Sequence, residues 1–364
     1  EVQHASTNQA DDSFRGTSGS LSETTLYDPL RQAAATLREM LRAEAAKALD
    51  HPPEELVARL GGFELAGNAE TRVTYGELVA RDVQWQVPEE EVPLKPASEF
   101  TIIGQSLPRV DLPAKLTGEA IFGYDARAEG VLYGAAVHRP TIEAKMLSAQ
   151  PGEAAGMPGV VQVVIEDDFA GVVAESRLQA WTARNALAVE WDEGHLWQQE
   201  ELEEIVTAGG RGGVNIQREG SADSVLKQGT PITAEYRCSM GAHAPMEPQA
   251  ALAIIGPEGG QVWTATQYET SARGRVAEAL GLEPTQIEVI PTYLGGGFGR
   301  KIELPPVPSP AVEAAHLSRA VGAPVHVGWD RTEEMRDGFL RPLSHHRLSA
   351  VLTAEGRIEA MRHE

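Results

Sequence analysis

Two kinds of residue pattern alternate along the 364 residues and predict a mixed α+β fold. Short runs rich in β-branched residues, such as "GVVQVVIEDDFAGVVA" and "QVWTATQ", are bounded by glycine and acidic turns and predict strands. Segments with apolar residues at three- and four-residue steps, such as "AVEAAHLSRAVG", predict helices between them. No fixed-period repeat is visible, so we expect α+β layers rather than a solenoid.

The composition restricts the partners of the chain. There are 31 Lys and Arg against 53 Asp and Glu, which gives a net charge of −22. This charge repels phosphate backbones and anionic lipid, so we expect no nucleic acid partner. No apolar run approaches the roughly 20 residues of a spanning helix, so we expect no membrane insertion by this chain. Cys238 is the only cysteine, which excludes an internal disulfide and a four-cysteine iron–sulfur cluster within this sequence.

The first part of the chain is predicted to be helical. Asp28 and Pro29 form an N-cap and first-turn pair, and an amphipathic pattern then continues to about residue 49, where "HPP" ends it. Thr74 and Glu77 have the capping-box spacing of a second, short helix. We therefore assign residues 1–85 to an N-terminal helical segment, and the proline-punctuated residues 86–112 to a linker.

The rest of the chain is predicted to form two further domains. Residues 113–194 read as a small β-rich domain, and residues 195–364 as a larger α+β domain. Within the latter, 196–230 is polar and glycine-rich and is expected to be a long surface excursion. Both ends, "EVQHA" and "GRIEAMRHE", stop inside apparent strands, so we expect the chain to be a segment of something longer.

The stretch "YLGGGFGRK" (293–301) has glycine at four of the five consecutive positions 295–299. A tight turn is the simplest explanation of such a cluster. A dinucleotide fingerprint fails because Arg300 stands where its third glycine belongs, and the spacings of Walker and protein-kinase loops fail as well. A nucleotide-dependent transferase is therefore disfavoured. What remains is a loop whose bare amides face a bulky anionic ligand, with Arg300 and Lys301 complementing its charge.

These residues resemble the large subunits of molybdenum hydroxylases, the xanthine dehydrogenase and aldehyde oxidase family, and most closely the beta subunit of isoquinoline 1-oxidoreductase. Three further stretches in the same order carry the resemblance. They are "HAPMEPQAALA" with "VWTATQ" (243–253 and 262–267), "GAPVHVGWDRTEEMRDGFLRP" (322–342), and "IGQSLPRVDLPAKLTGEAIFGYD" (103–125). "RGTSGS" (15–20) and the helix after it also have a counterpart in the family.

The resemblance implies an a/b hammerhead domain over 113–194 and parts of the molybdopterin-binding domains, with residues 1–85 in one of them and 195–364 forming the first, C-terminally incomplete. It implies a molybdopterin cofactor with molybdenum, in the cytosine dinucleotide form. Gln267 and Phe298 would be catalytic, and no residue would ligate the metal directly. The cofactor-binding residues would be Gly295, Gly296, Gly297, Phe298, Gly299, Arg300 and Gln267.

Glu247 and Glu303 are the candidate substrate residues. A buried carboxylate at Glu247 could orient the substrate or the loop, with the alternative of capping a neighbouring turn. Ile302 stands where xanthine-oxidising members carry a glutamate, which argues against purine substrates. His243, His345 and His346 lack metal-ligand spacing, because adjacent histidines point apart on a strand, and are expected to be surface or structural residues.

Three departures from the family pattern matter. The Gly-x-Gly-Glu-like motif that carries the family's general base is absent, and so is its Gly-Gln-Gly segment. Proline-dense "PPVPSP" (305–310) also replaces a region that usually runs straight into helix. We therefore expect a complementary molybdopterin-domain polypeptide, or the removed ends of this chain, to supply the base and complete the site.

The resemblance implies a hydroxylase that oxidises an aldehyde or an N-heterocyclic C–H with oxygen from water. Electrons would pass to a separate iron–sulfur or cytochrome subunit, because one cysteine cannot hold a cluster. The alternative is a non-catalytic scaffold or binding module that retains the fold. Relatives of the isoquinoline type favour the bacterial periplasm over the cytoplasm.

Overall fold

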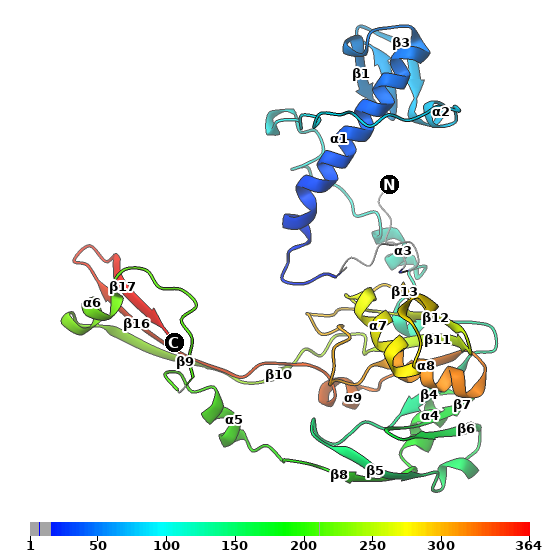
Figure 1. Cartoon of the computed structure of the whole chain (residues 1–364), viewed down its shortest axis with the longest axis vertical. Helices are drawn as coiled ribbons and strands as arrows, with labels where there is room; N and C mark the ends of the chain where they lie inside the picture. The colour runs from blue at the N-terminus through cyan, green and yellow to red at the C-terminus, as the bar shows by residue number, and fades with distance from the viewer. Residues whose placement is uncertain (1–6, 8–15, 211) are drawn as a thin grey trace. The chain divides into compact units, whose positions relative to one another are not determined.

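The computed structural model describes residue 7, residues 16–210 and residues 212–364. The strand-like "EVQHA" and the first residue of "RGTSGS" lie outside these residues. The chain divides into two compact units (Figure 1). One comprises Thr17–Pro113, and the other comprises the described residues of Ala114–Glu364 together with residues 7 and 16. None of the helices in the described part of the chain is long and apolar enough to cross a membrane.

The Thr17–Pro113 unit is one long helix packed on a three-stranded sheet. Apolar side chains of the helix and the sheet form its core, which includes Leu41, Phe63 and Leu78. The unit contains α1 (Ser22–Leu49), β1 (Leu56–Arg59), β2 (Gly62–Leu65), β3 (Asn68–Thr74) and α2 (Tyr75–Val79), and the sheet order is β1-β2-β3.

Helix α1 begins upstream of the predicted boundary, so the expected start at Asp28 is wrong. Pro29 lies inside the helix, because residues 22–28 are themselves helical and Thr25 Oγ1 donates to Leu21 O at 2.9 Å. The helix ends where predicted, at Asp50, which takes a left-handed conformation. The Thr74–Glu77 capping box of α2 is confirmed. The sheet between these helices was not predicted from the sequence.

The larger unit is organised around a seven-stranded mixed sheet. Its order is β13-β12-β11-β14-β4-β7-β6. The strands are β4 (Leu132–Ala136), β6 (Val160–Glu166), β7 (Phe169–Ala174), β11 (Ala250–Gly256), β12 (Gly259–Thr264), β13 (Ile287–Pro291) and β14 (Val325–Gly328). Strands from the predicted hammerhead segment and from residues 250–328 thus share one sheet, because β4 pairs in parallel with β14.

Helices cover both faces of this sheet. On one face, α7 (Glu269–Leu280) and α8 (Pro310–Val321) pack over an aliphatic core that includes Val276, Leu317 and the indole of Trp329. On the other face, α4 (Arg177–Arg184) packs its Ala180 against β4 and β7. The predicted ends of α7 and α8 are confirmed, since Gly281 and Gly322 cap them in the left-handed conformation.

Smaller elements complete the unit. The two-stranded pairs are β5 (Lys145–Gln150) with β8 (Ala188–Asp192), and β10 (Gly241–Ala242) with β15 (Leu340–Arg341). The remaining α-helices are α3 (Leu112–Thr117), α5 (Gln199–Ile205), α6 (Ala222–Gln228) and α9 (Arg331–Arg336). Single 3₁₀ turns lie at Gly123–Asp125, Ala154–Gly156 and Pro284–Gln286 in this unit, and at Pro53–Glu55 and Ala97–Glu99 in the Thr17–Pro113 unit.

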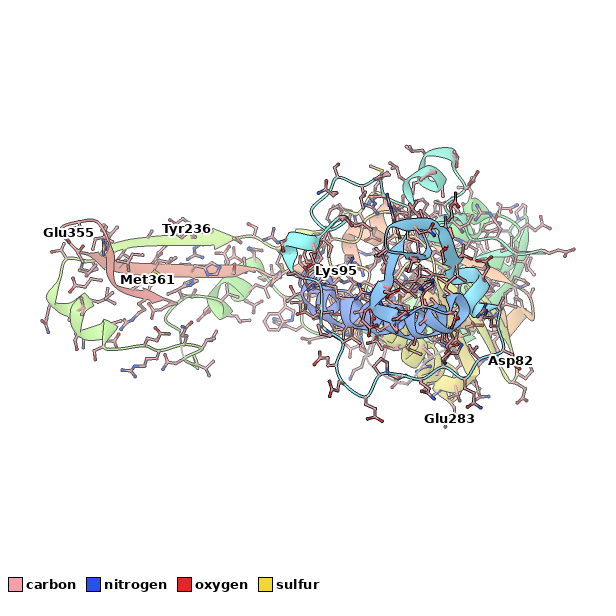
Figure 2. The ribbon with its side chains drawn as sticks, turned by 90° about the horizontal axis from the view of Figure 1, so that it is seen from above. Asp82, Lys95, Tyr236, Glu283, Glu355 and Met361 are labelled. Atoms are coloured by element: carbon pink, nitrogen blue, oxygen red, sulfur yellow. The ribbon has the colours of Figure 1, made fainter. Side chains whose placement is uncertain are left out.

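A three-stranded sheet contains the last residues of the chain. Its order is β17-β16-β9, with β9 (Ile232–Cys238), β16 (Ser344–Leu352) and β17 (Ile358–His363). Tyr236 and Met361, labelled in Figure 2, lie on its two outer strands and are exposed. Helices α5 and α6 lie within residues 196–230, so the predicted excursion is partly helical.

Candidate functional site

The glycine-rich loop follows β13 directly. Parallel pairing of β13 with β12 brings the end of β13 next to the "TATQ" segment that leaves β12. Gly296, Phe298 and Gly299 have φ values of +91°, +52° and +86°, so the loop backbone alternates into the left-handed region. Successive N–H groups in such a conformation converge on one side of the chain, which is the geometry of an anion-binding nest.

The loop offers four consecutive N–H groups. Among the described residues, the amides at positions 296–299 donate no hydrogen bond within the protein. Phe298 is 72% exposed, and a methyl group built on Gly299 meets no atom within 4 Å. The outer side of the loop is therefore an open array of donors.

Glu247 holds the start of the loop. Its Oε2 accepts the N–H of Gly295 at 2.8 Å, and its own N–H donates to Gly295 O at 3.0 Å. Oε1 accepts the N–H of Tyr124 at 3.0 Å. A Cβ on Gly295 would lie 2.3 Å from Glu247 Cβ, so only glycine permits this approach. The carboxylate thus orients the loop, the second of the roles that the sequence left open.

Lys301 holds the end of the loop. Its Nζ donates to Glu247 Oε2 at 2.5 Å, and the lysine side chain is fully buried. Its carbonyl oxygen accepts the N–H of Gln267 at 2.9 Å. One carboxylate oxygen therefore contacts both ends of the loop, at Gly295 and at Lys301. The sequence offered no signal for this pairing, because 54 residues separate its partners.

Gln267 lies beside the loop. A Cβ on Gly297 would be 3.8 Å from its Oε1, which places the side-chain amide against the middle of the glycine run. The structure therefore brings together Gln267 and the loop, as the sequence predicted.

Arg300 is built into the interior instead of facing a ligand. Its side chain is 1% exposed, its Nε lies 3.7 Å from Glu334 Oε1, and its guanidinium stacks 5.4 Å from the ring of Trp329. Burial lowers the pKa of Arg300, and Glu334 opposes that shift. Both cations after the loop are thus neutralised by buried carboxylates, and anion binding here rests on backbone N–H groups.

Glu303 is also interior. It is 3% exposed, and one of its oxygens lies 3.8 Å from the guanidinium of Arg275. Burial raises its pKa, against the hydrogen bond from Ser309 and the charge of Arg275. The structure thus holds this carboxylate in the interior near Arg275, and its role toward a substrate stays a prediction.

The histidines singled out in the sequence have structural partners. His243 Nδ1 lies 3.0 Å from Phe339 O, and His345 Nδ1 accepts the N–H of Ala208 at 3.2 Å. His346 points to the other face of β16, where its Nδ1 is 3.0 Å from Nε2 of His363. No cluster of three potential metal ligands occurs among the residues that the structure describes.

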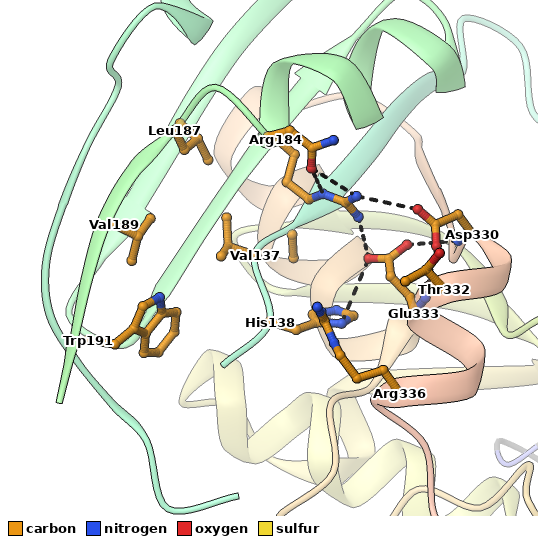
Figure 3. A pocket seen from close by; sticks show the side chains of 12 residues that line it. Val137, His138, Arg184, Leu187, Val189, Trp191, Asp330, Thr332, Glu333 and Arg336 are labelled. Carbon is orange, nitrogen blue, oxygen red and sulfur yellow. Dashed lines mark hydrogen bonds and ion pairs between the residues drawn. The ribbon is translucent and has the colours of Figure 1, made fainter. Parts of the chain in front are cut away.

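A histidine that the sequence did not single out, His138, lies in a buried cluster of charged residues. His138 is buried, with Nε2 3.0 Å from Glu313 Oε1 and Nδ1 2.8 Å from Asp337 Oδ2. Burial alone would lower its pKa, but Glu313 and Asp337 outweigh burial and raise the pKa to about 10. The adjoining cavity of about 470 Å³ is lined by β8 and α9 (Figure 3), and Arg184 pairs there with Asp330 and Glu333.

The loop and Gln267 fit an oxygen-rich, anionic cofactor. Four free donors in series, glycines that allow close backbone approach, and a side-chain amide beside them are what such a group requires. The buried Glu247–Lys301 pair fixes that surface from behind.

Comparisons with known proteins agree with this geometry. Residues 208–364 match the family described as "Molybdopterin cofactor-binding domain". The chain is 29% identical to isoquinoline 1-oxidoreductase subunit beta of Brevundimonas diminuta, over 93% of this chain and 48% of that protein. It is 31% identical to a membrane-bound aldehyde dehydrogenase [pyrroloquinoline-quinone] of Gluconacetobacter polyoxogenes, over 96% of this chain and 47% of that protein. The chain thus spans about half the length of these curated relatives.

Among solved structures, quinoline 2-oxidoreductase from Pseudomonas putida 86 has a similar fold. The TM-score is 0.58 at 23% identity, covering 72% of this chain and 39% of that one. The predicted α+β class is confirmed by this likeness and by the strands and helices above. The matched cofactor-binding domain and the curated relatives confirm the predicted resemblance: the chain belongs to the molybdopterin-binding large subunits of molybdenum hydroxylases, the xanthine dehydrogenase and aldehyde oxidase family.

Proposed function

We propose that this chain forms part of the cofactor site of an oxidoreductase that oxidises an aldehyde or an N-heterocyclic C–H with oxygen from water. The single observation that carries the proposal is the run of four free N–H groups at positions 296–299 beside Gln267. The relatives named above act, by their names, on isoquinoline and on aldehydes, which supports both substrate classes.

Molybdopterin with molybdenum would supply the two-electron redox chemistry. The residues of this chain would bind and orient it. The N–H groups of Gly296, Gly297, Phe298 and Gly299 would donate to its oxygen atoms, and the Gln267 amide would hold one oxygen from the side. Because Glu247 fixes both ends of the loop, these donors need no reorganisation when negative charge develops, and such preorganised donors are the most effective ones.

Several finer features belong to the same proposal. We propose the cytosine dinucleotide form of the cofactor and a bacterial periplasmic location, in preference to the cytoplasm, both from the isoquinoline-type resemblance. A complementary molybdopterin-domain polypeptide would supply the general base, since the sequence holds no Gly-x-Gly-Glu motif. Electrons would leave through a separate iron–sulfur or cytochrome subunit.

Metal and cofactor analysis of the native assembly tests the proposal. We expect molybdenum and a pterin to copurify with the chain. A quinone in their place would favour the chemistry named for the Gluconacetobacter relative. Absence of any cofactor from an assembly that contains the complementary polypeptide would favour the scaffold alternative.

A matched pair of variants ties the cofactor to the loop. Gly297 has an ordinary φ, and a Cβ there would meet its neighbours at 3.5 Å or more, so the backbone accepts the Cβ of Gly297→Val without a clash. Its side chain would crowd the donors, and we expect molybdenum content to fall. Gly213→Val is the control, because a Cβ at Gly213 meets no atom within 4 Å and this residue lies outside the loop. Equal molybdenum in both variants would contradict the proposed site.

A further inference from the structure

A second cavity, of about 330 Å³, lies beneath the proline-dense segment. Three stretches of chain line it, namely residues 139–142, 306–308 and 336–340. Its volume is at the lower end of small-molecule sites, which run from about 300 to 1,000 Å³. Its walls are mainly apolar, and Pro140, Ile142, Val307, Phe339 and Leu340 supply them.

One side chain of the wall carries a charge that no carboxylate balances. Arg139 is partly buried and lines the cavity, where its guanidinium donates to Pro306 O. Among the described residues, no acidic group lies within ion-pair distance of it. Arg336, which lines the same cavity, is neutralised by Asp337 through contacts of 2.7 Å and 2.9 Å.

The charged group that acts on Arg139 is another cation, Arg275. Arg275 donates to Val307 O at 3.0 Å, so arginines contact two consecutive carbonyls of the proline-dense segment. Burial, and then the charge of Arg275, lower the pKa of Arg139. A buried or half-buried guanidinium is stable when a carboxylate or phosphate pairs with it. Arg139 has no such partner among the described residues, so its guanidinium is available to an anionic ligand that enters the cavity.

The larger cavity, beside His138, shows the contrast. Each of its buried cations has carboxylate partners inside the protein, Glu333 for Arg184 and both Glu313 and Asp337 for His138. Figure 3 shows the contacts of Arg184 with Asp330 and Glu333, and of His138 with Glu333. Within the described part of the chain, that cavity therefore has no unpaired cation with which to select an anionic ligand.

We propose that the cavity lined by Arg139 and Phe339 binds a small aromatic carboxylate, with its ring between the apolar walls and its carboxylate on the Arg139 guanidinium. Flat apolar walls from proline and phenylalanine suit an aromatic ring. The planar guanidinium suits a carboxylate, with which it forms two parallel hydrogen bonds. The proposal does not rest on the cofactor, and it applies whether or not the chain carries molybdenum.

Calorimetric titration of the purified full chain with benzoate tests the proposal. Benzamide, which has the same shape and no charge, is the comparison ligand. We expect benzoate to bind at least about tenfold more tightly than benzamide, because a charge-assisted pair replaces a neutral hydrogen bond. In Arg139→Gln, benzoate should lose about this factor and benzamide should be little changed. Arg218→Gln, at an exposed arginine outside the cavity, should match the unmodified protein.

A second pair of variants covers the case in which Arg139→Gln does not fold. Ile142 is 59% exposed, so substitutions there leave the interior intact. Ile142→Glu puts a negative charge at the cavity wall and should weaken benzoate but not benzamide, whereas Ile142→Gln should weaken neither selectively. The proposal would be overturned if the two ligands bound with equal affinity, or if benzoate did not bind at millimolar concentration. It would also be overturned if neither Arg139→Gln nor Ile142→Glu changed the affinity for benzoate.

Discussion

The Glu247 carboxylate and the Lys301 ammonium form a buried ion pair at 2.5 Å, across the two ends of the loop that presents four free amides. The lysine is fully buried and the glutamate side chain is 10% exposed. Burial lowers the pKa of Lys301, and Glu247 opposes this shift. Loss of either charge would therefore leave the other one buried and unpaired.

Removal of the negative charge from this pair should destabilise the protein. Glu247→Gln leaves a buried ammonium without its counter-ion, for which a loss of about 3 kcal/mol in the free energy of unfolding is expected. Chemical denaturation measures it. The double variant Glu247→Gln, Lys301→Met should recover part of the loss, because the buried charge is gone.

Glu355→Gln is the control for this experiment. Glu355 lies in the exposed turn between β16 and β17, labelled in Figure 2, and surface substitutions of this kind change stability by about 0.5 kcal/mol or less. If Glu247→Gln were as mild as Glu355→Gln, the ion pair would not be what fixes the loop.

Two glycines of the loop should respond differently to the same methyl group. Gly295→Ala puts a Cβ 2.3 Å from Glu247 Cβ, so Glu247 must move away from the loop that it holds. Gly299→Ala meets open space and carries only the left-handed backbone cost of about 1–2 kcal/mol. Thermal unfolding should show the larger loss for Gly295→Ala, and the reverse order would show that the loop yields more easily than the structure implies.

His138 should make stability fall on the alkaline side. Its pKa is about 10 in the folded protein and 6.5 is the ordinary value, so the folded state keeps a proton that the unfolded chain releases. This contribution is fully present below about pH 6.5 and is lost as pH rises towards 10. Denaturation measured across this range should show the decline, and His138→Gln should flatten it. His363→Gln, at an exposed histidine, should keep the unmodified profile.

His326 should make the free energy of unfolding fall at acid pH. It is fully buried, its Nε2 donates to Gly123 O at 3.0 Å, and burial lowers its pKa to about 4. Because the folded pKa lies below the unfolded value, the contribution is present above about pH 6.5 and is lost as pH falls towards 4. The free energy of unfolding should therefore drop over this interval, and His326→Gln, which keeps a donor for Gly123, should reduce the drop. An unchanged slope would mean that other groups control the acid limb.

The sequence was informative wherever a signal is local. Thr74 and Glu77 three positions apart, glycine after an amphipathic run at 281 and 322, and glycines that follow a strand at 295–299 each act on neighbouring backbone, and the structure has the corresponding caps and loop. The pattern of helix α1 failed only at its start, where the proline was taken as a first-turn residue although it lies one turn or more inside the helix.

What the sequence did not disclose depends on long-range pairing. Arg300 and Lys301 were expected to face a ligand, since nothing nearby in the chain shows that Glu334 and Glu247 reach them. The charge cluster around His138 draws its acids from α8 and from the end of α9, and no spacing rule links such residues. Turns could be predicted from the sequence, whereas the positions of the buried charges could be identified only from the folded structure.

The parallel pairing of Leu132 with Val325 has a consequence for biosynthesis. Strands β4, β7 and β6 leave the ribosome long before β14, the neighbour that joins them to the other half of their sheet. Until then the edge of β4 is unpaired, and nascent chains with open edges are prone to aggregate. Chaperone occupancy during translation is therefore expected to be highest between the emergence of residue 136 and that of residue 328.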